Sequence, residues 1–365
     1  MPDPSVAPAR CGSFNRSLLA CVHSDWDPAS RFRVMQYLPA LRNAGWRITL
    51  RRNQPQRYYR PKLPNAALAR LHRRAVKTAR AVMRQRDIRT AARHDLVWVN
   101  RDLLRADPGY EARLVTRNPR YVFDVDDAVY LNDTRGHFAW CCRHAAWVMA
   151  GNDEIAAQAR RHTDRVSVFP TVVDTGRYLV SETGDGSGHL RVGWIGSSLS
   201  IEQTLMPHMA MFRALQQQLD FTLVVMTRPR PIVDIPGLDW TYVEWSASRE
   251  LALNQYMDIG IMPLEDTPMQ RAKCGLKILQ YMAAGIPAVA SPVGVNTRLI
   301  DHGRSGFLAA DSGQWASAIH LLQRDDAARE RIAQQGRAFC RQHYSVEQWS
   351  PRLLELFNRL SSRPA

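Results

Sequence analysis

Two lysines and a glutamine stand at helical spacing in the second half of the chain, and their types suit a phosphorylated ligand. At about 3.6 residues per turn, Lys273, Lys277 and Gln280 fall on one face of a predicted helix. We expect this helix to begin at Cys274-Gly275-Leu276 and to end at Gly285-Ile286-Pro287. Its N-terminal N–H groups and dipole would attract an anion, and two ammonium groups would add to that attraction. The alternative is the solvated face of an amphipathic helix.

Three aspartates mark the end of a predicted strand in the first half of the chain. The strand is Tyr121–Val125, and Asp124, Asp126 and Asp127 lie at its carboxyl end. Ligands of open α/β sheets bind outside the carboxyl ends of strands, so we predict Asp126 and Asp127 as catalytic carboxylates. We expect Asp124 to be structural and to cap the following turn. A divalent-metal site is a weaker alternative, because no further cluster of His or carboxylate residues accompanies these aspartates.

The segments around these residues predict a layered α/β architecture. Leu18–Val22 is a predicted strand, Ser30 opens a helix that Gly45 ends, and Trp46–Leu50 is the next strand. Such βαβ units build parallel sheets with right-handed crossovers.

The second half repeats this order. A strand over Leu190–Ile195, a helix over Ile201–Gln218 and a strand over Phe221–Met226 are predicted. Between the halves, Ser181–His189 is polar and Gly-rich, as is typical of a linker.

The length of 365 residues suits two domains, and no apolar run approaches the roughly 20 residues of a membrane-spanning helix. We expect a first domain over 1–180, a linker over 181–189 and a second domain over 190–345. Residues 346–365 are expected to form a helix that packs back on the first domain. The six cysteines show neither metal-site spacing nor a disulfide framework, which favours a reducing, cytoplasmic location.

The net charge of +15 is concentrated in one segment. Between Arg51 and Arg93 there are fourteen Lys or Arg and one acid, Asp87. Leu68–Arg86 within it is predicted to be a basic amphipathic helix, with apolar and basic residues on opposite sides: Leu68, Leu71, Ala75, Ala79, Val82 and Met83 against Arg70, Arg73, Arg74, Lys77, Arg80 and Arg84. Its apolar side would pack on the sheet, or the helix would contact an anionic membrane surface. Nucleic acid is disfavoured, because no aromatic residues interleave with the arginines.

Longer stretches resemble the GT-B-fold, nucleotide-sugar-dependent glycosyltransferases of family 4, which retain the configuration of the transferred sugar. The matching stretches of the second half are KCGLKILQYMAAGIPAVASPVGVN (Lys273–Asn296), HGRSGFLA (His302–Ala309) and HYSVEQW (His343–Trp349). Those of the first half are DPASRFRVMQYLPAL (Asp27–Leu41), FDVDDAVY (Phe123–Tyr130), AGN (Ala150–Asn152) and FPTVVDTGRY (Phe169–Tyr178). The resemblance implies two doubly wound, Rossmann-like domains facing each other across a cleft.

The resemblance also implies roles for single residues. Gly275 and Leu276 would offer backbone N–H groups to the donor, Lys273 or Lys277 would neutralise the departing diphosphate, and Gln280 would meet the ribose. The family commonly has two Glu where this chain has Ala272 and Gln280, which puts the donor sugar or the activity itself in question. Three further residues are expected on the donor side: Gly196, Ser197 and Arg228.

Arg31 and Arg33, which follow the turn after the first strand, are expected to line the acceptor side of the cleft, where they would suit an anionic acceptor. No cofactor or metal is expected, because protein cations would replace a metal at the diphosphate.

Three functions remain open on the sequence alone. The first is a retaining hexosyltransferase that acts on a cell-surface glycan or a lipid-linked acceptor, at the inner face of a membrane. The second is a nucleotide-sugar epimerase, for which Glu265-Asp266 would be the carboxylate pair. The third is a non-catalytic partner protein that keeps the fold.

Overall fold

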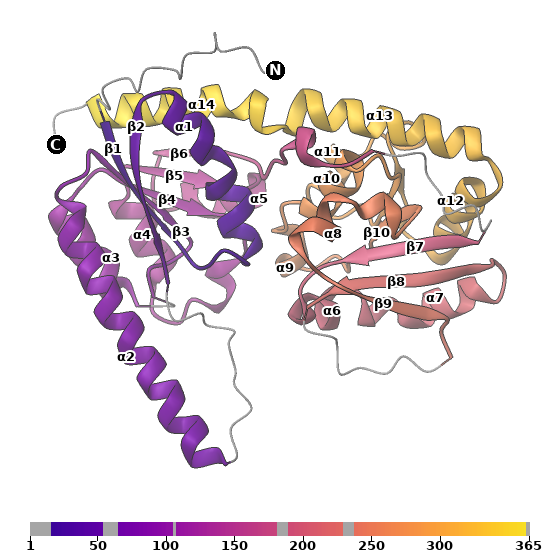
Figure 1. The fold of residues 1–365 in the computed structure, drawn as a ribbon, viewed down its shortest axis with the longest axis horizontal. Coiled ribbons are helices and arrows are strands. Elements are labelled where there is room, and N and C mark those ends of the chain that lie inside the picture. Colours follow the sequence, from indigo (N-terminus) through magenta and orange to yellow (C-terminus); the bar gives the residue numbers. More distant parts are fainter. Residues whose placement is uncertain (1–15, 54–64, 105–106, 181–188, 229–236, 363–365) are drawn as a thin grey trace, which may run out of the picture.

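The strands form two six-stranded sheets, one in each half of the chain (Figure 1). The computed structural model describes residues 16–53, 65–104, 107–180, 189–228 and 237–362. The sheet orders are β2-β1-β3-β4-β5-β6 and β12-β11-β10-β7-β8-β9, and neighbouring strands run parallel. The predicted fold class, two doubly wound α/β domains, is confirmed. The predicted linker lies outside the described residues except for His189.

The strands are short and largely apolar, as expected of parallel strands that helices cover. Their bounds are β1 Arg16–Val22, β2 Trp46–Arg52, β3 Leu96–Asn100, β4 Tyr121–Val125, β5 Trp147–Ala150, β6 Val166–Val168, β7 Leu190–Ile195, β8 Phe221–Thr227, β9 Trp240–Glu244, β10 Ile259–Met262, β11 Ala288–Ala290 and β12 Phe307–Leu308.

The helices connect these strands and cover both faces of each sheet. In the first half they are η1 Ser30–Val34, η2 Met35–Tyr37, α1 Leu38–Asn43, α2 Ala66–Ala91, α3 Pro108–Arg117, η3 Val129–Asn132, α4 His137–His144, α5 Asp153–Arg160 and η4 Thr175–Arg177. The remainder are α6 Ser198–Thr204, η5 Met206–His208, α7 Met209–Gln216, α8 Ala247–Leu251, η6 Leu253–Gln255, α9 Pro268–Arg271, α10 Leu276–Ala283, α11 Asn296–Leu299, α12 Ser312–Arg324, α13 Asp326–Tyr344 and α14 Val346–Ser362.

Two predicted helices are interrupted. The helix after β1 consists of a π-helical turn, a 3₁₀ turn and α1, and Pro39 lies in the first turn of α1. The helix predicted over Ile201–Gln218 is divided into α6 and α7 by a 3₁₀ turn that contains Pro207. Proline lacks a backbone N–H, so it is tolerated at a helix start but breaks a helix interior.

The last helix returns from the second half to the first. In Figure 1, α13 runs along the second half and α14 continues over the first. The buried face of α14 joins the core of the first half, where the Phe357 ring packs edge-on against Trp98 and Trp46, with centroids 5.1 and 6.1 Å away. The C-terminal segment therefore connects the two halves.

The N-terminal part of α2 stands away from the sheet (Figure 1). Leu68, Leu71 and Val82, predicted to pack on the sheet or to meet a membrane, are 44%, 63% and 50% exposed. Arg84, predicted on the exposed basic side, is instead fully buried. It pairs with Asp87 at 3.0 Å and donates to the carbonyls of Val22 and Leu103. Among the described residues, no helix is both long and apolar enough to cross a membrane.

Candidate active site

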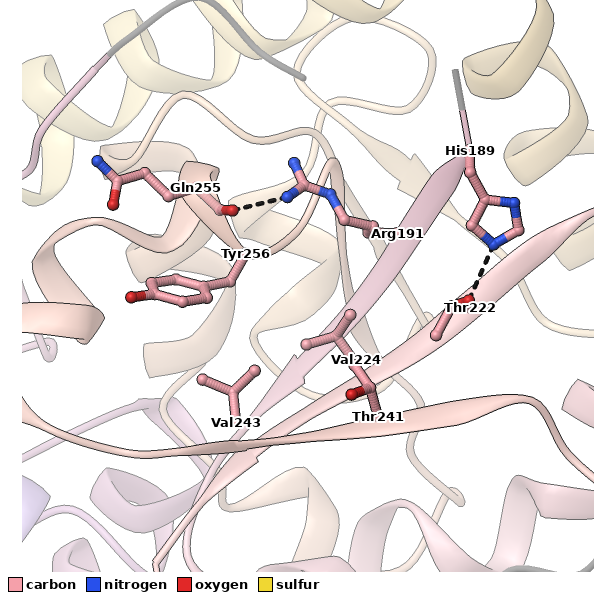
Figure 2. A pocket seen from close by; sticks show the side chains of 8 residues that line it. All are labelled: His189, Arg191, Thr222, Val224, Thr241, Val243, Gln255 and Tyr256. Atoms are coloured by element: carbon pink, nitrogen blue, oxygen red, sulfur yellow. Dashed lines mark hydrogen bonds between the residues drawn. The ribbon is translucent and has the colours of Figure 1, made fainter. Parts of the chain in front are cut away.

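A hollow on the second sheet lies away from the predicted site. Figure 2 shows its lining, to which Thr222, Val224, Thr241 and Val243 contribute from β8 and β9. Thr222 and Thr241 lie near the amino ends of their strands, whereas ligands of such sheets bind beyond the carboxyl ends. None of the predicted site residues lines this hollow.

The predicted site residues follow strands that flank the point where the strand order reverses, or strands next to those. In the first sheet that point lies between β1 and β3, and in the second between β7 and β10. Connections leave such a point in opposite directions and open a crevice at the carboxyl edge. The segments after β1, β3 and β4 therefore meet in the first half, and those after β7 and β10 meet in the second.

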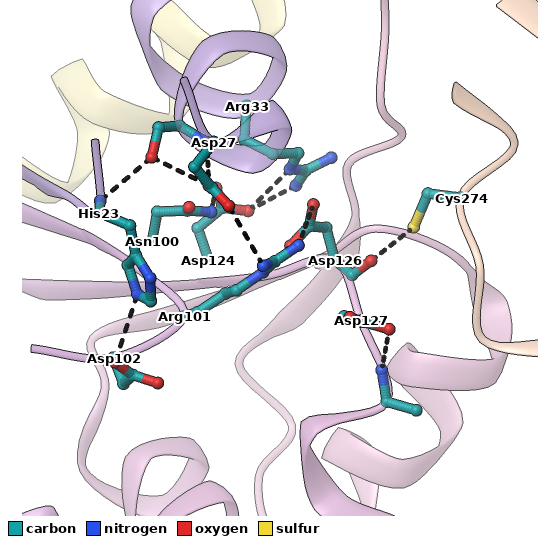
Figure 3. Close-up of polar contacts among 12 residues, drawn as sticks. His23, Asp27, Arg33, Asn100, Arg101, Asp102, Asp124, Asp126, Asp127 and Cys274 are labelled. Atoms are coloured by element: carbon teal, nitrogen blue, oxygen red, sulfur yellow. Dashed lines mark hydrogen bonds and ion pairs between the residues drawn. The ribbon is translucent and has the colours of Figure 1, made fainter. Parts of the chain in front are cut away.

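Arg33 is held in the interior of the first half. It is 2% exposed, and its Nε donates to Oδ1 of Asp124 at 3.1 Å (Figure 3). Nδ2 of Asn100 donates to the other carboxylate oxygen of Asp124, Oδ2, also at 3.1 Å. Arg33 also donates to the carbonyl of Phe169. Burial raises the pKa of Asp124, although the Arg33 guanidinium opposes this effect. Asp124 is therefore an ion-pair partner inside the domain, and the prediction that it caps the following turn is wrong.

Arg101 holds the first of the two predicted catalytic carboxylates. Its Nε lies 2.7 Å from Oδ1 of Asp126, and its NH1 lies 3.7 Å from Oδ1 of Asp27 (Figure 3). Although burial disfavours the charged form, the Arg101 guanidinium lowers the pKa of Asp126 below its ordinary value. Asp126 is therefore an ionised carboxylate that is already paired.

The backbone of Arg101 is strained. Its φ of 64° makes it the single non-glycine residue with positive φ in the described ranges. Such strain persists where surrounding contacts over-determine it, and it is often associated with function. Arg101 was not among the predicted site residues, although it follows β3 at the same edge of the sheet where Asp126 follows β4.

Asp127 makes the local turn contact that was predicted for Asp124. Its Oδ1 accepts from the N–H of Ala128 at 2.9 Å, and its carbonyl accepts from Val129 at 2.7 Å. Its side chain is half-buried, and within the part of the chain that the structure describes no partner contacts its Oδ2. Of the two predicted catalytic carboxylates, Asp127 is thus the one with an uncommitted oxygen.

Helix α10, which was predicted to bind the donor, begins at the last residue of the predicted start, Cys274-Gly275-Leu276. Gly275 has a φ of 68° and ends the preceding segment, so that the helix starts at Leu276. Lys273 therefore precedes the helix, and its predicted place on the same helical face as Lys277 and Gln280 is wrong. A Cβ at Gly275 would lie 2.2 Å from Cδ1 of Leu299, so both the conformation and the space require glycine.

The two predicted polar residues within α10 differ in environment. Lys277 is half-buried with its Nζ 5.0 Å from the centre of the Trp194 ring, and burial, with Lys273 nearby, lowers its pKa to about 7. Gln280 is 4% exposed and lies within the core face of the helix. The indole Nε1 of Trp194 is buried without a hydrogen-bond partner among the described residues.

Three further predicted donor residues lie at the carboxyl edge of the second sheet. Gly196 follows β7, and a Cβ there would lie 2.5 Å from the Trp194 ring. Ser197 caps α6 by accepting from the N–H of Ser200. Arg228 follows β8, and its guanidinium lies 5.4 Å from the ring centre of Trp26, which comes from the first half.

Arg31 bridges the two halves. Its guanidinium forms two hydrogen bonds to the carboxylate of Glu250, one of them 2.9 Å long, and Glu250 also accepts from Nε1 of Trp245 at 2.8 Å. Glu250 is 2% exposed. The two arginines predicted on the acceptor side are thus both ion-paired.

A second set of contacts joins the halves next to α10. Nδ2 of Asn152 donates to the carbonyls of Ala272 and Lys273, at 2.8 and 3.1 Å. The thiol of Cys274 lies 3.3 Å from the carbonyl oxygen of Asp126 (Figure 3). Ala272 is fully buried against the core of the first half, which explains a small apolar residue there. These contacts were not predicted, since the sequence places their partners 120 to 148 residues apart.

The alternative carboxylate pair in the second half lies at the surface. Glu265 and Asp266 are exposed, and Asp266 pairs with Arg271 at 2.5 Å. Within the described ranges, no group of three or more His, Cys, Asp or Glu residues is arranged to hold a metal ion.

The second half matches a known family. Residues 192–325 match the model for glycosyl transferases group 1, a range that includes Gly196, Ser197, Arg228 and all of α10. A stretch of 82 residues is 35% identical to a D-inositol 3-phosphate glycosyltransferase from Nocardioides sp. and spans 21% of this chain and 18% of that protein. The predicted resemblance is confirmed for this domain.

Solved structures share the fold of nearly the whole chain. HepE from Anabaena in complex with UDP-glucose is 16% identical with a TM-score of 0.66, and the match covers 94% of this chain and 100% of that one. Sucrose-phosphate synthase from Thermosynechococcus elongatus is 14% identical with a TM-score of 0.71, and the match covers 94% and 99%. The predicted GT-B fold is confirmed.

Proposed function

We propose that this chain, which carries a glycosyl transferases group 1 domain, transfers a hexose from a nucleotide-sugar donor to a hydroxyl acceptor with retention of configuration. The observation that carries the proposal is the cationic N-terminal region of α10 within the matched domain, where Lys273 and Lys277 flank Gly275. HepE, which has the same fold, binds UDP-glucose, and this supports a nucleotide sugar as donor.

The donor site would act on the leaving group. The bond between the sugar C1 and the diphosphate oxygen breaks, and negative charge grows on that oxygen. Lys273, Lys277 and the N–H groups of Gly275 and Leu276 would stabilise this charge without a metal ion, because preorganised cations and donors are most effective where charge develops. Gly196, Ser197, Arg228 and Gln280 are proposed to hold the rest of the nucleotide.

The acceptor oxygen would attack on the face that the diphosphate leaves, and its proton would pass to the departing phosphate oxygen. Asp127 is proposed to orient the acceptor or to stabilise positive charge on the sugar, because one of its oxygens is uncommitted. Asp126 is proposed to stabilise the segment that carries Asp127, through its ion pair with Arg101. Arg31 and Arg33 are proposed to shape the acceptor side through their ion pairs.

We further propose that the acceptor is a cell-surface glycan or a lipid-linked molecule, and that the protein meets the inner face of a membrane through α2. The exposed Leu68, Leu71 and Val82 on a helix rich in arginine support this. In such helices, the burial of apolar side chains in the membrane and the attraction of basic side chains to anionic lipid both contribute to membrane affinity.

Calorimetric titration with a panel of nucleoside diphosphates tests the donor site, followed by assay of their hexose conjugates for release of free nucleoside diphosphate. The double variant Lys273→Ala/Lys277→Ala should bind the preferred nucleotide at least tenfold more weakly, about 1.4 kcal/mol. Lys77→Ala, on α2, is the control and should bind as the parent does.

The outcomes separate the proposed transferase from other functions. A parent protein that binds a nucleotide but never releases free nucleoside diphosphate would be a non-catalytic partner, and conversion to another nucleotide sugar would indicate an epimerase. Unchanged affinity in the double variant would remove the two lysines from the donor site.

A further inference from the structure

The segment that precedes the donor helix is held by a residue of the other domain. Residues 272–274 lead directly into Gly275 and α10, and the backbone carbonyls of Ala272 and Lys273 accept hydrogen bonds from Asn152 of the first half. Ala272 is packed among core residues of the first half. The position of the donor loop thus depends on the first domain as well as on its own.

Asn152 uses both ends of its amide. Its Oδ1 accepts from the N–H of Ile155 at 2.9 Å and caps α5, while its Nδ2 donates to the carbonyls of Ala272 and Lys273. The side chain is 2% exposed. A buried carbonyl that loses its donor is costly, so these bonds fix the loop more firmly than exposed ones would.

The neighbouring Gly151 shows how closely the halves approach. A Cβ at this position would lie 2.4 Å from Sγ of Cys274 and 3.0 Å from Cα of Asp126. Only a residue without a side chain allows the donor loop to lie this close to the segment that carries the candidate carboxylates. This tight approach is independent of the hydrogen bonds of Asn152 and joins the same two segments.

We propose that Asn152 is a positioning residue for donor binding, which sets the place of Lys273 and Gly275 from across the domain boundary. The inference rests on the proposed donor site. It predicts that nucleotide affinity depends on a residue that touches no part of the nucleotide.

The test replaces Asn152 with serine. Serine keeps an oxygen that can cap α5 about as well as asparagine, but it has no amide that reaches the carbonyls of residues 272 and 273. We expect Asn152→Ser to raise the Kd for UDP, or for whichever nucleoside diphosphate the parent prefers, at least fivefold in calorimetry, with the donor KM rising more than kcat falls. Asn65→Ser, at the exposed N-cap of α2, is the matched control and should leave the Kd unchanged.

Gly151→Ala gives a second, independent measurement. The added methyl group should displace Cys274 and also weaken nucleotide binding, and Gly151→Ala/Cys274→Ala should recover part of the loss because the overlapping sulfur is removed. If the methyl group of Gly151→Ala disturbed only the first domain, adding Cys274→Ala would not recover nucleotide affinity.

The results distinguish a failure of the positioning role of Asn152 from a failure of the proposed donor site. If the parent binds the nucleotide and both Asn152→Ser and Gly151→Ala bind it within twofold of the parent, the positioning role is overturned and the donor site stands. If Asn152→Ser fails to fold, the recovery in the Gly151 and Cys274 pair decides alone. If the parent binds no nucleoside diphosphate, the proposed function itself fails, and the positioning role with it.

Discussion

The ammonium nitrogen of Lys277 lies 5.0 Å from the centre of the Trp194 ring, at the carboxyl edge of the second sheet. Burial, followed by the charge of Lys273, lowers the pKa of Lys277 from 10.5 to about 7. The aromatic face favours the charged form, but it does not offset the loss of water around the ammonium group. Lys277 is therefore partly neutral near pH 7, until an anion stabilises its charge.

Nucleotide binding should therefore take up a proton above pH 7. A diphosphate favours the charged form of Lys277, so the Kd for the nucleoside diphosphate should rise with pH, by up to about tenfold per pH unit, and level off below pH 7. Calorimetry at pH 7 and 9, in buffers with different ionisation enthalpies, measures both the Kd and the protons taken up.

Lys277→Arg is the control, because arginine stays charged throughout this range. Its Kd should be nearly independent of pH between 7 and 9. The lowered pKa of Lys277 also affects the stability of the protein without ligand. Between about pH 7 and 10.5 the unfolded state binds more protons than the folded state, so the free energy of unfolding should rise with pH in this window. An equal Kd for the parent at pH 7 and 9 would contradict the proposed role.

The two adjacent carboxylates should respond differently to the loss of charge. Asp127→Asn should lower turnover by about 10² or more while leaving nucleotide binding intact, because the proposed role needs a negative charge beside the sugar. Steady-state assay and calorimetry together measure this. If Asp127→Asn turns over at the parent rate, the role of Asp127 is limited to its hydrogen bond with the backbone of the following turn.

Asp126→Asn should act through stability. The change leaves Arg101 with a weaker partner at 2.7 Å in a partly buried position, so the free energy of unfolding should fall by about 1–3 kcal/mol. Urea unfolding of Asp126→Asn and Asp127→Asn side by side tests the distinction. Equal stability of the two variants would argue against a structural role of the Arg101–Asp126 pair.

The ion pair between Arg31 and Glu250 should contribute strongly to the contact between the halves. Arg31→Met leaves the carboxylate of Glu250 buried without its partner, and we expect a loss of about 3 kcal/mol in the free energy of unfolding. Arg31→Met/Glu250→Leu removes both charges and should be much less destabilising. If the stability losses of Arg31→Met and Glu250→Leu, each measured alone, sum to the loss in the double variant, the two side chains are not energetically coupled.

The exposed part of α2 should bind anionic vesicles. Flotation with vesicles that contain phosphatidylserine should recover more protein than flotation with phosphatidylcholine alone, and added salt should reduce the difference. Leu71→Ser/Val82→Ser removes two exposed apolar side chains and should lower recovery without affecting the fold. Equal recovery with both lipids would contradict the proposed membrane contact.

The sequence by itself determined the architecture of the second half and its resemblance to glycosyl transferases group 1. The alternation of apolar strands with amphipathic helices predicts a doubly wound sheet, because burial on both faces imposes that pattern locally. Gly275, Gly285 and Pro287 also define the bounds of α10 locally. The left-handed conformation at Gly275 makes the helix begin later than the spacing of Lys273, Lys277 and Gln280 suggests.

Only the tertiary structure decided how the charged residues are used. Arg101 and Asp126 meet because β3 and β4 are neighbours, and their pairing leaves Asp127 as the carboxylate with an open oxygen. Arg31 meets Glu250, and Asn152 meets Ala272, across a domain boundary that no local pattern records. Ion pairs and pKa values depend on what lies within a few ångströms in space, and in a chain of two domains those neighbours come from distant parts of the sequence.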